Sequence, residues 1–332
     1  MNTSTGQFDF AGKRVVIVGD LVADQFLKGT ISRVSREAPV FIVRHDETET
    51  RPGAAANTAA NIASLGGGAV LIGTVGDDEN AELLLKSLEP IVANDSIIRV
   101  TGSPTTTKVR VLAGQHYAAR QQMIRIDYEG SKDVSIHLRA RLAELFLKQA
   151  ETADAIVVSD YGYGIVTPEL FEQARSITSS RKIPLIVDSR FRLGEFSGAT
   201  SATPNQDEVE QILGGGFNDA DCERLRETLG LEALLVTRGN KGMLLIEAGK
   251  PPVSINAVGS GEPIDVTGAG DTVIAAYALG LAAGLSFAEA ARIANHAGSI
   301  VVMKKGTAIV TAEELARSLR EHSQTPQAAP AN

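Results

Sequence analysis

The sequence is short of cysteine and of positive charge. One cysteine, Cys222, occurs in 332 residues, so no internal disulfide can form and a stray thiol in a helix is the simplest interpretation. Asp and Glu number 40 against 32 Lys and Arg, which gives a formal net charge of −8. This balance argues against a nucleic-acid partner and against a polybasic membrane anchor. An anionic substrate therefore has to be met by a local cluster of basic residues.

Long apolar runs are missing as well. No stretch is long enough to span a bilayer, and Met1–Phe10 is polar where a secretory signal has a cation followed by an apolar run. We therefore expect a cytoplasmic protein with no membrane partner. Apolar residues make up 43% and charged residues 22% of the chain, as in ordinary soluble globular proteins. The length suffices for one large α/β domain or two smaller ones.

Short runs rich in β-branched residues recur along the chain, and each ends in an acid: Arg14–Asp20, Val70–Asp78, Ala155–Asp160 and Ile183–Asp188. Helical apolar spacing separates them, so the pattern predicts an α/β fold with a mostly parallel, buried sheet. Ligands of such sheets collect at the carboxyl ends of the strands. We expect Asp20 and Asp24, which follow the first run, to face that crevice, although solvated loop acids would have the same pattern.

Two sets of extended segments fall outside this rhythm. Residues 30–51 form the first set, and residues 103–128 contain the second, with Thr105–Leu112 and Met123–Tyr128. We assign both sets to a small β-sheet lid folded over the crevice. One face of such a sheet must be hidden, either over a substrate or against a second copy of the chain.

Three basic residues stand out in the second set of lid segments. Strand alternation places Lys108 and Arg110 on one face of a strand, and Arg125 lies on the segment that follows. A solvated strand face is the alternative interpretation. In an acidic chain, two cations that point the same way also suit an anionic substrate.

The stretch Glu262–Thr272 runs into a helix of small residues, Val273–Leu281. Gly268 and Gly270 flank an alanine and form a tight turn whose free N–H groups point out of a helix start, which makes an anion seat. The helix dipole keeps Asp271, in the first helical turn, ionised beside that seat. A base next to an anion hole is what phosphoryl transfer to a hydroxyl needs. The plainer alternative is a helix N-terminal charge with glycines that allow packing.

Two further segments place polar residues after a strand. Asn205 and Glu208 have the spacing of a capping box, and taken alone that is the better interpretation. Thr237, Gly239 and Gly242 lie at the next strand end, where a hairpin would also account for both glycines.

The segment Asp265–Asp271 ends in Gly-Ala-Gly-Asp and resembles the signature of the ribokinase-like (PfkB) sugar kinases. The resemblance implies a three-layer α/β/α fold with a mostly parallel central sheet and a β-sheet lid, in one kinase domain over residues 1–322. Residues 323–332 are rich in Pro, Ala and Gln, and this composition predicts a disordered tail. The family resemblance implies ATP as the phosphoryl donor and Asp271 as the general base. The N–H groups around the transferring phosphoryl group would be those of Gly268, Ala269 and Gly270.

The resemblance also implies roles in binding the sugar. Asp20 and Asp24 would accept hydrogen bonds from its hydroxyls, since a carboxylate can accept several at once. Gly53 and Asn57 would approach the sugar ring, with Ala54 standing where the family has a second glycine.

For the nucleotide and its ions, the resemblance implies hard oxygen ligands. Asn205 and Glu208 would place Mg²⁺ through its waters. A monovalent cation such as K⁺ would be held by Asp265, the carbonyl of Thr267 and carbonyls around residues 302–306. Contacts to ATP would come from Thr237, Gly239, Gly242 and, near the adenine, Asn295.

One branch of the family is especially similar. Residues 31–40 and the basic lid segments resemble the heptose 7-phosphate kinases, which phosphorylate the anomeric hydroxyl of D-glycero-D-manno-heptose 7-phosphate. Lys108, Arg110 and Arg125 would then meet the phosphate. Tyr163 departs from the branch, which usually has a lysine there. Another sugar or a nucleoside is thus an alternative acceptor, and a non-catalytic sugar- or nucleotide-sensing protein is an alternative of another class.

Two motifs are absent from the sequence. The Gly-x-x-x-x-Gly-Lys-[Ser/Thr] loop, the other common way of holding ATP, does not occur. The His-x-Gly-His signature of a nucleotidylyltransferase, which longer heptose kinases carry in a fused domain, is also missing. We therefore expect kinase activity only. Because one face of the lid sheet must be hidden, we also expect a homodimer formed through the lid.

Overall fold

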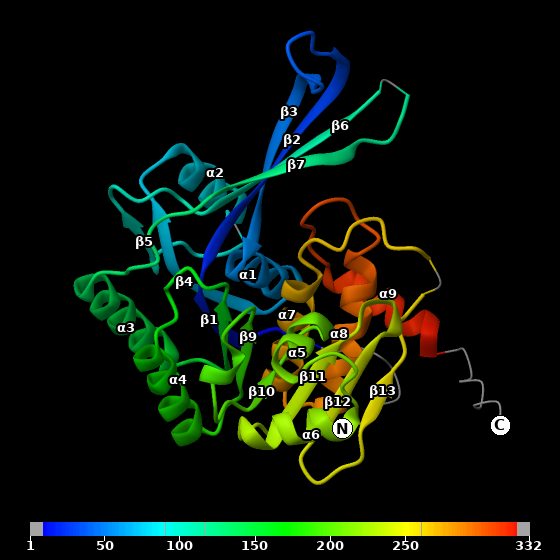
Figure 1. Cartoon of the computed structure of the whole chain (residues 1–332). Helices are drawn as coiled ribbons and strands as arrows, with labels where there is room; N and C mark the ends of the chain where they lie inside the picture. The colour runs from blue at the N-terminus through cyan, green and yellow to red at the C-terminus, as the bar shows by residue number, and fades with distance from the viewer. Residues whose placement is uncertain (1–8, 90, 116, 260, 324–332) are drawn as a thin grey trace, which may run out of the picture.

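The structure is a computed structural model, and it describes residues 9–89, 91–115, 117–259 and 261–323. Apart from Ser323, which ends the last helix, the tail predicted at 323–332 lies outside these ranges. Figure 1 shows a large body of helices around a central sheet, with a long, narrow lid of strands projecting from its top. No helix in the described ranges has the length and apolar character needed to cross a membrane.

The central sheet has nine strands in the order β13-β12-β11-β10-β9-β8-β1-β4-β5. In chain order the strands are β1 (Arg14–Gly19), β4 (Gly68–Gly76), β5 (Ile97–Val100), β8 (Ala155–Asp160), β9 (Leu185–Ser189), β10 (Ser201–Ala202), β11 (Ala233–Thr237), β12 (Met243–Glu247) and β13 (Val253–Ile255). In this spatial order, all neighbouring strands between β5 at one edge and β11 pair in parallel. The pairs β11–β12 and β12–β13 are antiparallel. The predicted α/β fold with a mostly parallel sheet is confirmed.

Helices cover both faces of this sheet, because successive side chains of each buried strand point to opposite sides. On β1, Val15 and Ile17 join one apolar core while Val16 and Val18 join the other. The first core packs under α1 (Ala55–Ser64), α2 (Glu79–Leu88), α7 (Ala269–Ala282), α8 (Phe287–Val301) and α9 (Ala312–Ser323). The second packs under α3 (Ile136–Ala150), α4 (Pro168–Arg181), α5 (Gln206–Leu213) and α6 (Asp219–Thr228), where the thiol of Cys222 is buried.

The lid is a four-stranded sheet in the order β3-β2-β6-β7. Its strands are β2 (Leu21–Val34), β3 (Phe41–Ala54), β6 (Thr107–Gly114) and β7 (Gln121–Tyr128). The predicted lid is present, but its first segment starts at Leu21 and not near residue 30. Only Asp20 separates β1 from β2, so the chain passes from body to lid without a loop that the sequence could have signalled.

The passage from β3 back into the body is strained. Ala54 has φ 54°, a left-handed conformation that costs a residue with a side chain roughly 1–2 kcal/mol. Helix α1 starts directly after it, two residues before the predicted start at Asn57. A Cβ placed on the neighbouring Gly53 would lie 2.6 Å from Asp24 Oδ2. Gly53 therefore makes room for a carboxylate of the lid.

Candidate active site

A cleft of ≈ 470 Å³ lies between the base of the lid and the carboxyl ends of the central strands. Residues far apart in the sequence meet there, because parallel strands all end at the same edge. Of the residues predicted from the sequence, the cleft is lined by Asp24, Lys108, Arg110, Arg125, Asn205, Glu208, Thr237, Thr267, Gly268, Ala269, Gly270 and Asp271. The predicted residues that do not line it are Asp20, Gly53, Asn57, Gly239, Gly242, Asp265 and Asn295.

The anion seat is built at the start of α7. Gly268 caps the helix with φ 77°, and the helix begins at Ala269. The N–H of Ala269 is already bonded to the carbonyl of Val266, at 3.2 Å. In the part of the chain that the structure describes, the N–H groups of Gly268 and Gly270 have no partner. Two of the three predicted N–H groups are therefore unpaired, and successive N–H groups at such a turn favour an anion.

Asp271 lies beside the seat and is 3% exposed. Its Oδ2 accepts a hydrogen bond from Asn57 Nδ2 at 2.9 Å, and its Oδ1 accepts one from the hydroxyl of Tyr161 at 2.7 Å. Asn57 also donates to the carbonyl of Gly268 at 3.3 Å. The amide predicted to approach a sugar ring thus lies behind the carboxylate and ties it to the seat.

Burial raises the pKa of Asp271 to about 6. The hydrogen bonds from Asn57 and Tyr161 oppose that rise, as does the ammonium of Lys108, while the carboxylate of Asp24 adds to it. A carboxylate with this pKa is largely ionised at pH 7 and above, yet it is a stronger proton acceptor than an ordinary aspartate. It suits a general base at neutral pH.

The lid cations differ in what they contact. Arg110 Nη1 lies 2.5 Å from Asp24 Oδ1, and Asp24 Oδ2 accepts a hydrogen bond from Thr307 Oγ1 at 2.8 Å. Arg125 is paired with the neighbouring Asp127 at 2.8 Å. Lys108 has no carboxylate partner among the described residues, and burial lowers its pKa. Among the described residues, Lys108 is therefore the one of these three lid cations whose charge is not offset by an ion pair.

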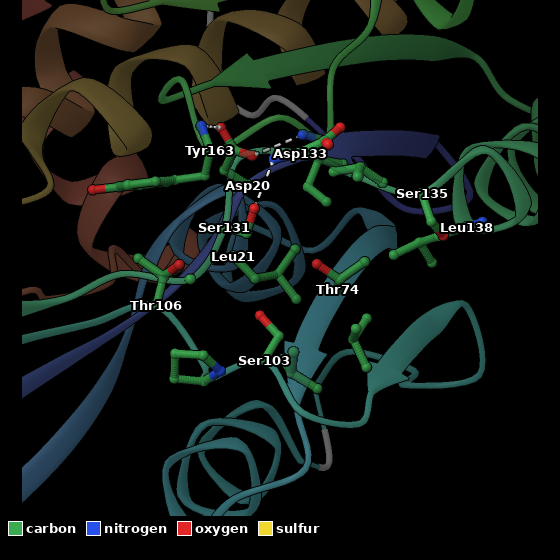
Figure 2. Close-up of a pocket in the computed structure, with 16 residues that line it drawn as sticks. Asp20, Leu21, Thr74, Ser103, Thr106, Ser131, Asp133, Ser135, Leu138 and Tyr163 are labelled. Atoms are coloured by element: carbon green, nitrogen blue, oxygen red, sulfur yellow. Dashed lines mark hydrogen bonds between the residues drawn. The ribbon is translucent and has the colours of Figure 1, made fainter.

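Asp20 does not face the cleft. Its carboxylate accepts hydrogen bonds from the backbone N–H groups of Tyr161 at 2.8 Å, Tyr163 at 3.1 Å and Ile165 at 3.3 Å. Figure 2 shows it in the wall of a second cavity of ≈ 190 Å³, with dashed lines to the chain around Tyr163. The structure therefore gives Asp20 a role in holding the 161–165 turn, and its contact with a sugar hydroxyl stays a prediction.

Asn205 and Glu208 form the capping box that the sequence offered as the plainer alternative. Asn205 Oδ1 accepts from the N–H of Glu208 at 2.9 Å, and Glu208 Oε2 accepts from the N–H of Asn205 at 2.8 Å. Both side chains nonetheless line the cleft. In the described ranges no three His, Cys, Asp or Glu side chains are grouped to hold a metal unaided. These oxygen ligands fit Mg²⁺ that keeps most of its waters and binds phosphate oxygens.

Asp265 joins two loops behind the seat. Its carboxylate accepts hydrogen bonds from the N–H groups of Thr267 and Gly306, each at 2.9 Å. Although burial opposes it, these bonds hold the pKa of Asp265 below its ordinary value. A carboxylate and backbone carbonyls are oxygen ligands that suit a monovalent cation. Both oxygens of the Asp265 carboxylate, however, already accept hydrogen bonds from N–H groups.

The remaining predicted nucleotide contacts lie at the β11–β12 hairpin and on α8. Gly242 has φ 80°, and a Cβ there would come 2.0 Å from the carbonyl of Ile255. Gly239 has φ 56° and open space around it. Asn295 Nδ2 donates to the carbonyl of Asn256 at 2.7 Å. Hairpin geometry accounts for Gly242, and contacts to ATP by these residues stay predictions.

The cleft-lining residues that were not assigned a role from the sequence include Tyr161, Asp188 and Arg190. Tyr161 and Arg190 directly follow β8 and β9, and Asp188 is the next-to-last residue of β9. This position at the carboxyl ends of the strands was the signal in the sequence that could have identified them as site residues. Arg190 makes no ion pair in the described part of the chain. Burial, with Glu208 and Asp271 nearby, raises the pKa of Asp188 well above its ordinary value.

Comparison with known proteins agrees with this geometry. Residues 13–314 match the model of a family described as pfkB family carbohydrate kinase. The bifunctional protein HldE of Hahella chejuensis is 41% identical over 318 residues, which cover 94% of this chain and 64% of that protein. HldE of Shewanella amazonensis is 39% identical over 320 residues, with 94% and 65% covered. The chain thus spans slightly less than two thirds of the length of these relatives.

Solved structures of similar fold include two sugar kinases. Arabidopsis thaliana ribokinase, complexed with ribose and ATP, has a TM-score of 0.72 and 21% identity, covering 93% of this chain and 99% of that one. Escherichia coli phosphofructokinase-2, in complex with potassium, has a TM-score of 0.75 and 19% identity, covering 94% and 99%. At such identities the likeness supports the three-layer fold.

Proposed function

The chain belongs to the pfkB family of carbohydrate kinases, and from that membership we propose that it transfers the γ-phosphoryl group of ATP to a sugar hydroxyl. The observation that supports this proposal is the cleft, where a buried carboxylate, Asp271, adjoins the N–H groups of Gly268 and Gly270, which have no partner among the described residues. Asp271 would take the proton of the attacking hydroxyl. The N–H groups would stabilise the charge on the phosphoryl group as it moves.

The acceptor in this proposal is D-glycero-D-manno-heptose 7-phosphate, phosphorylated at its anomeric hydroxyl. Two observations favour it: the resemblance of the lid segments to heptose 7-phosphate kinases, and relatives named bifunctional protein HldE at about 40% identity. In a chain of net charge −8, a cleft that presents Lys108 and Arg190 without ion-pair partners in the described ranges also favours an acceptor that already carries phosphate. Such a sugar phosphate would be met in the cytoplasm.

ATP would lie along the half of the cleft formed by Thr237, the capping box and the start of α7. Mg²⁺, held through waters by Asn205 and Glu208, would neutralise part of the charge of the phosphates. K⁺ near Asp265 and the carbonyl of Thr267 would add positive charge behind the seat. The lid would exclude water that otherwise competes for the phosphoryl group.

A panel of acceptors tests the proposal. With ATP and Mg²⁺, we expect D-glycero-D-manno-heptose 7-phosphate to give the highest kcat/KM among heptose 7-phosphate, unphosphorylated heptose, ribose, fructose 6-phosphate and adenosine, measured by coupled ADP release. A higher value for another sugar or for the nucleoside would reassign the acceptor. Binding of ATP without turnover of any acceptor would support a sensing protein instead.

Replacement of Lys108 tests whether the acceptor binds in the cleft. Lys108→Met keeps the apolar stem but removes the charge, so KM for heptose 7-phosphate should rise roughly ten- to a hundredfold, the worth of one hydrogen bond to a charged group, with little change for ATP. Lys28→Met is the matched control, because Lys28 lies on the neighbouring lid strand, pairs with Glu47 and Glu49 and does not line the cleft.

We also propose that two copies pair through the lid. Strand β7 is an edge strand of the lid and is exposed along its whole length. It carries large apolar side chains, Met123, Ile124, Ile126 and Tyr128, that are each between 41% and 56% exposed. An exposed apolar edge strand invites a second chain. Analytical ultracentrifugation at micromolar concentration should show a dimer, and Ile124→Lys should shift it toward monomer; a monomeric unmodified chain contradicts the pairing.

A further inference from the structure

Tyr161 contacts the base but has no part in the chemistry described so far. It follows the last residue of β8, lines the cleft and donates its hydroxyl to Asp271 Oδ1 at 2.7 Å. We propose that Tyr161 is a positioning residue, which works with Asn57 to fix the Asp271 carboxylate in the orientation that faces the anion seat. This inference rests on the proposed function only for its effect on turnover.

The two donors come from different parts of the body and reach different oxygens. Asn57, on α1, holds Oδ2, and Tyr161, after β8, holds Oδ1. A carboxylate that accepts a hydrogen bond at only one oxygen can still rotate about the Cβ–Cγ bond, whereas hydrogen bonds to both oxygens prevent that rotation. Each oxygen keeps a second lone pair, so a sugar hydroxyl can still donate to the fixed carboxylate.

Tyr161 is itself held firmly. The Asp20 carboxylate accepts hydrogen bonds from the backbone N–H groups of Tyr161, Tyr163 and Ile165. Figure 2 shows Asp20 beside Tyr163. The ammonium of Lys108 lies 5.8 Å from the centroid of the Tyr161 ring, within the range of a cation–π contact. Asp20 therefore acts on the base indirectly, because it fixes the turn that presents the tyrosine.

The charges around Asp271 come from several elements. Asp24 on β2 and Lys108 on β6 face it from the lid, Asp188 on β9 faces it from the sheet, and Asn57 and Tyr161 are its uncharged partners. Removal of the Tyr161 hydroxyl takes away one of the two hydrogen bonds that oppose the effect of burial on its pKa. The pKa of Asp271 should therefore rise further above about 6, and less of the base is ionised at any given pH.

The test is Tyr161→Phe, with Tyr163→Phe as matched control. The control makes the same deletion two residues away, where the hydroxyl bonds to Glu129 at 3.0 Å and not to the base. In Tyr161→Phe we expect the acid limb of the kcat profile to move up by about one pH unit, the worth of one hydrogen bond to a charged group. The loss should be greatest below pH 6 and shrink toward pH 8, with KM for ATP unchanged and the control unshifted.

A second measurement separates this inference from the proposed function. Asp271 can be titrated directly by carbon NMR in full-length protein labelled with ¹³C-aspartate, its signal assigned by loss in Asp271→Asn. Its midpoint should rise in Tyr161→Phe and stay in place in Tyr163→Phe. Equal midpoints in both variants, or an activity loss of the same factor at every pH, would overturn the inference. Absence of turnover in the unmodified protein would instead overturn the proposed function, and the titration would still decide the role of Tyr161.

Discussion

Replacement of Asp271 by asparagine is expected to lower kcat by a factor on the order of 10² to 10⁴, the usual contribution of a general base. The amide has the size of the carboxylate and can still accept a hydrogen bond from Asn57 or Tyr161, which bind the two oxygens of Asp271. It cannot accept a proton. Steady-state kinetics with ATP and the best acceptor should therefore show a loss in kcat, with KM for ATP and the melting temperature nearly unchanged.

The matched control for this variant is Asp207→Asn. Asp207 is an exposed acid in the first turn of α5, close to the capping box, and it does not line the cleft. Loss of the same charge there should leave kcat within about twofold, since exposed charges contribute little. The base assignment fails if Asp271→Asn turns over at the rate of the unmodified protein, or if both variants lose activity alike.

Much of the fold was predictable because a buried parallel strand leaves a plain trace in the sequence. Runs such as Arg14–Gly19 and Ala155–Asp160 are apolar on both faces, since helices cover both sides of the sheet. The start of the lid was not predictable in the same way. Leu21–Gly29 follows β1 after a single residue, and nothing local marks the point where the chain leaves one sheet for another.

The site divides along a similar line. The edge at which residues gather follows from parallel topology, and strand alternation correctly placed Lys108 and Arg110 toward one cleft. The direction in which each side chain points, and its hydrogen-bond partners, could not be predicted from the sequence. Whether Asp20 meets a sugar or a backbone depends on a turn about 140 positions later, shaped by Gly162 and Gly164 at φ 78° and 94°.

The hydrogen bond between Tyr161 and Asp271 could not be predicted from the sequence for a related reason. Tyr161 and Asp271 are 110 positions apart, and each follows its own strand or turn. A tyrosine after a buried strand is equally compatible with a solvated ring. Only the three-dimensional meeting of β8 with the start of α7 shows that its hydroxyl reaches a carboxylate, so pairings of this kind are beyond what periodicity and spacing indicate.

The anion seat leads to the second large expected effect: Gly268→Ala should lower kcat by a factor on the order of 10² to 10³, the cost of losing an oxyanion-type donor. Gly268 has φ 77°, and a Cβ there would lie 2.6 Å from Asn57 Nδ2 and 2.9 Å from Thr307 Cγ2. At these distances either the turn or the side chains of Asn57 and Thr307 must move. Movement of the turn misplaces the N–H groups of the seat, and movement of Asn57 disturbs the amide that holds Asp271.

Backbone strain and this steric conflict can be separated by Gly66→Ala. Gly66, just beyond the end of α1, has φ 97°, but a Cβ added there would meet no atom within 4 Å. The variant should lose about 1–2 kcal/mol of unfolding free energy for the left-handed backbone, measured by urea denaturation, and keep its kcat. In its proposed role the seat would bind the phosphoryl group most strongly as charge builds on it, so Gly268→Ala should lower kcat more than it raises KM for ATP. If Gly268→Ala loses only the stability that Gly66→Ala loses and keeps its turnover, the N–H groups at the start of α7 do not hold the transferring phosphoryl group.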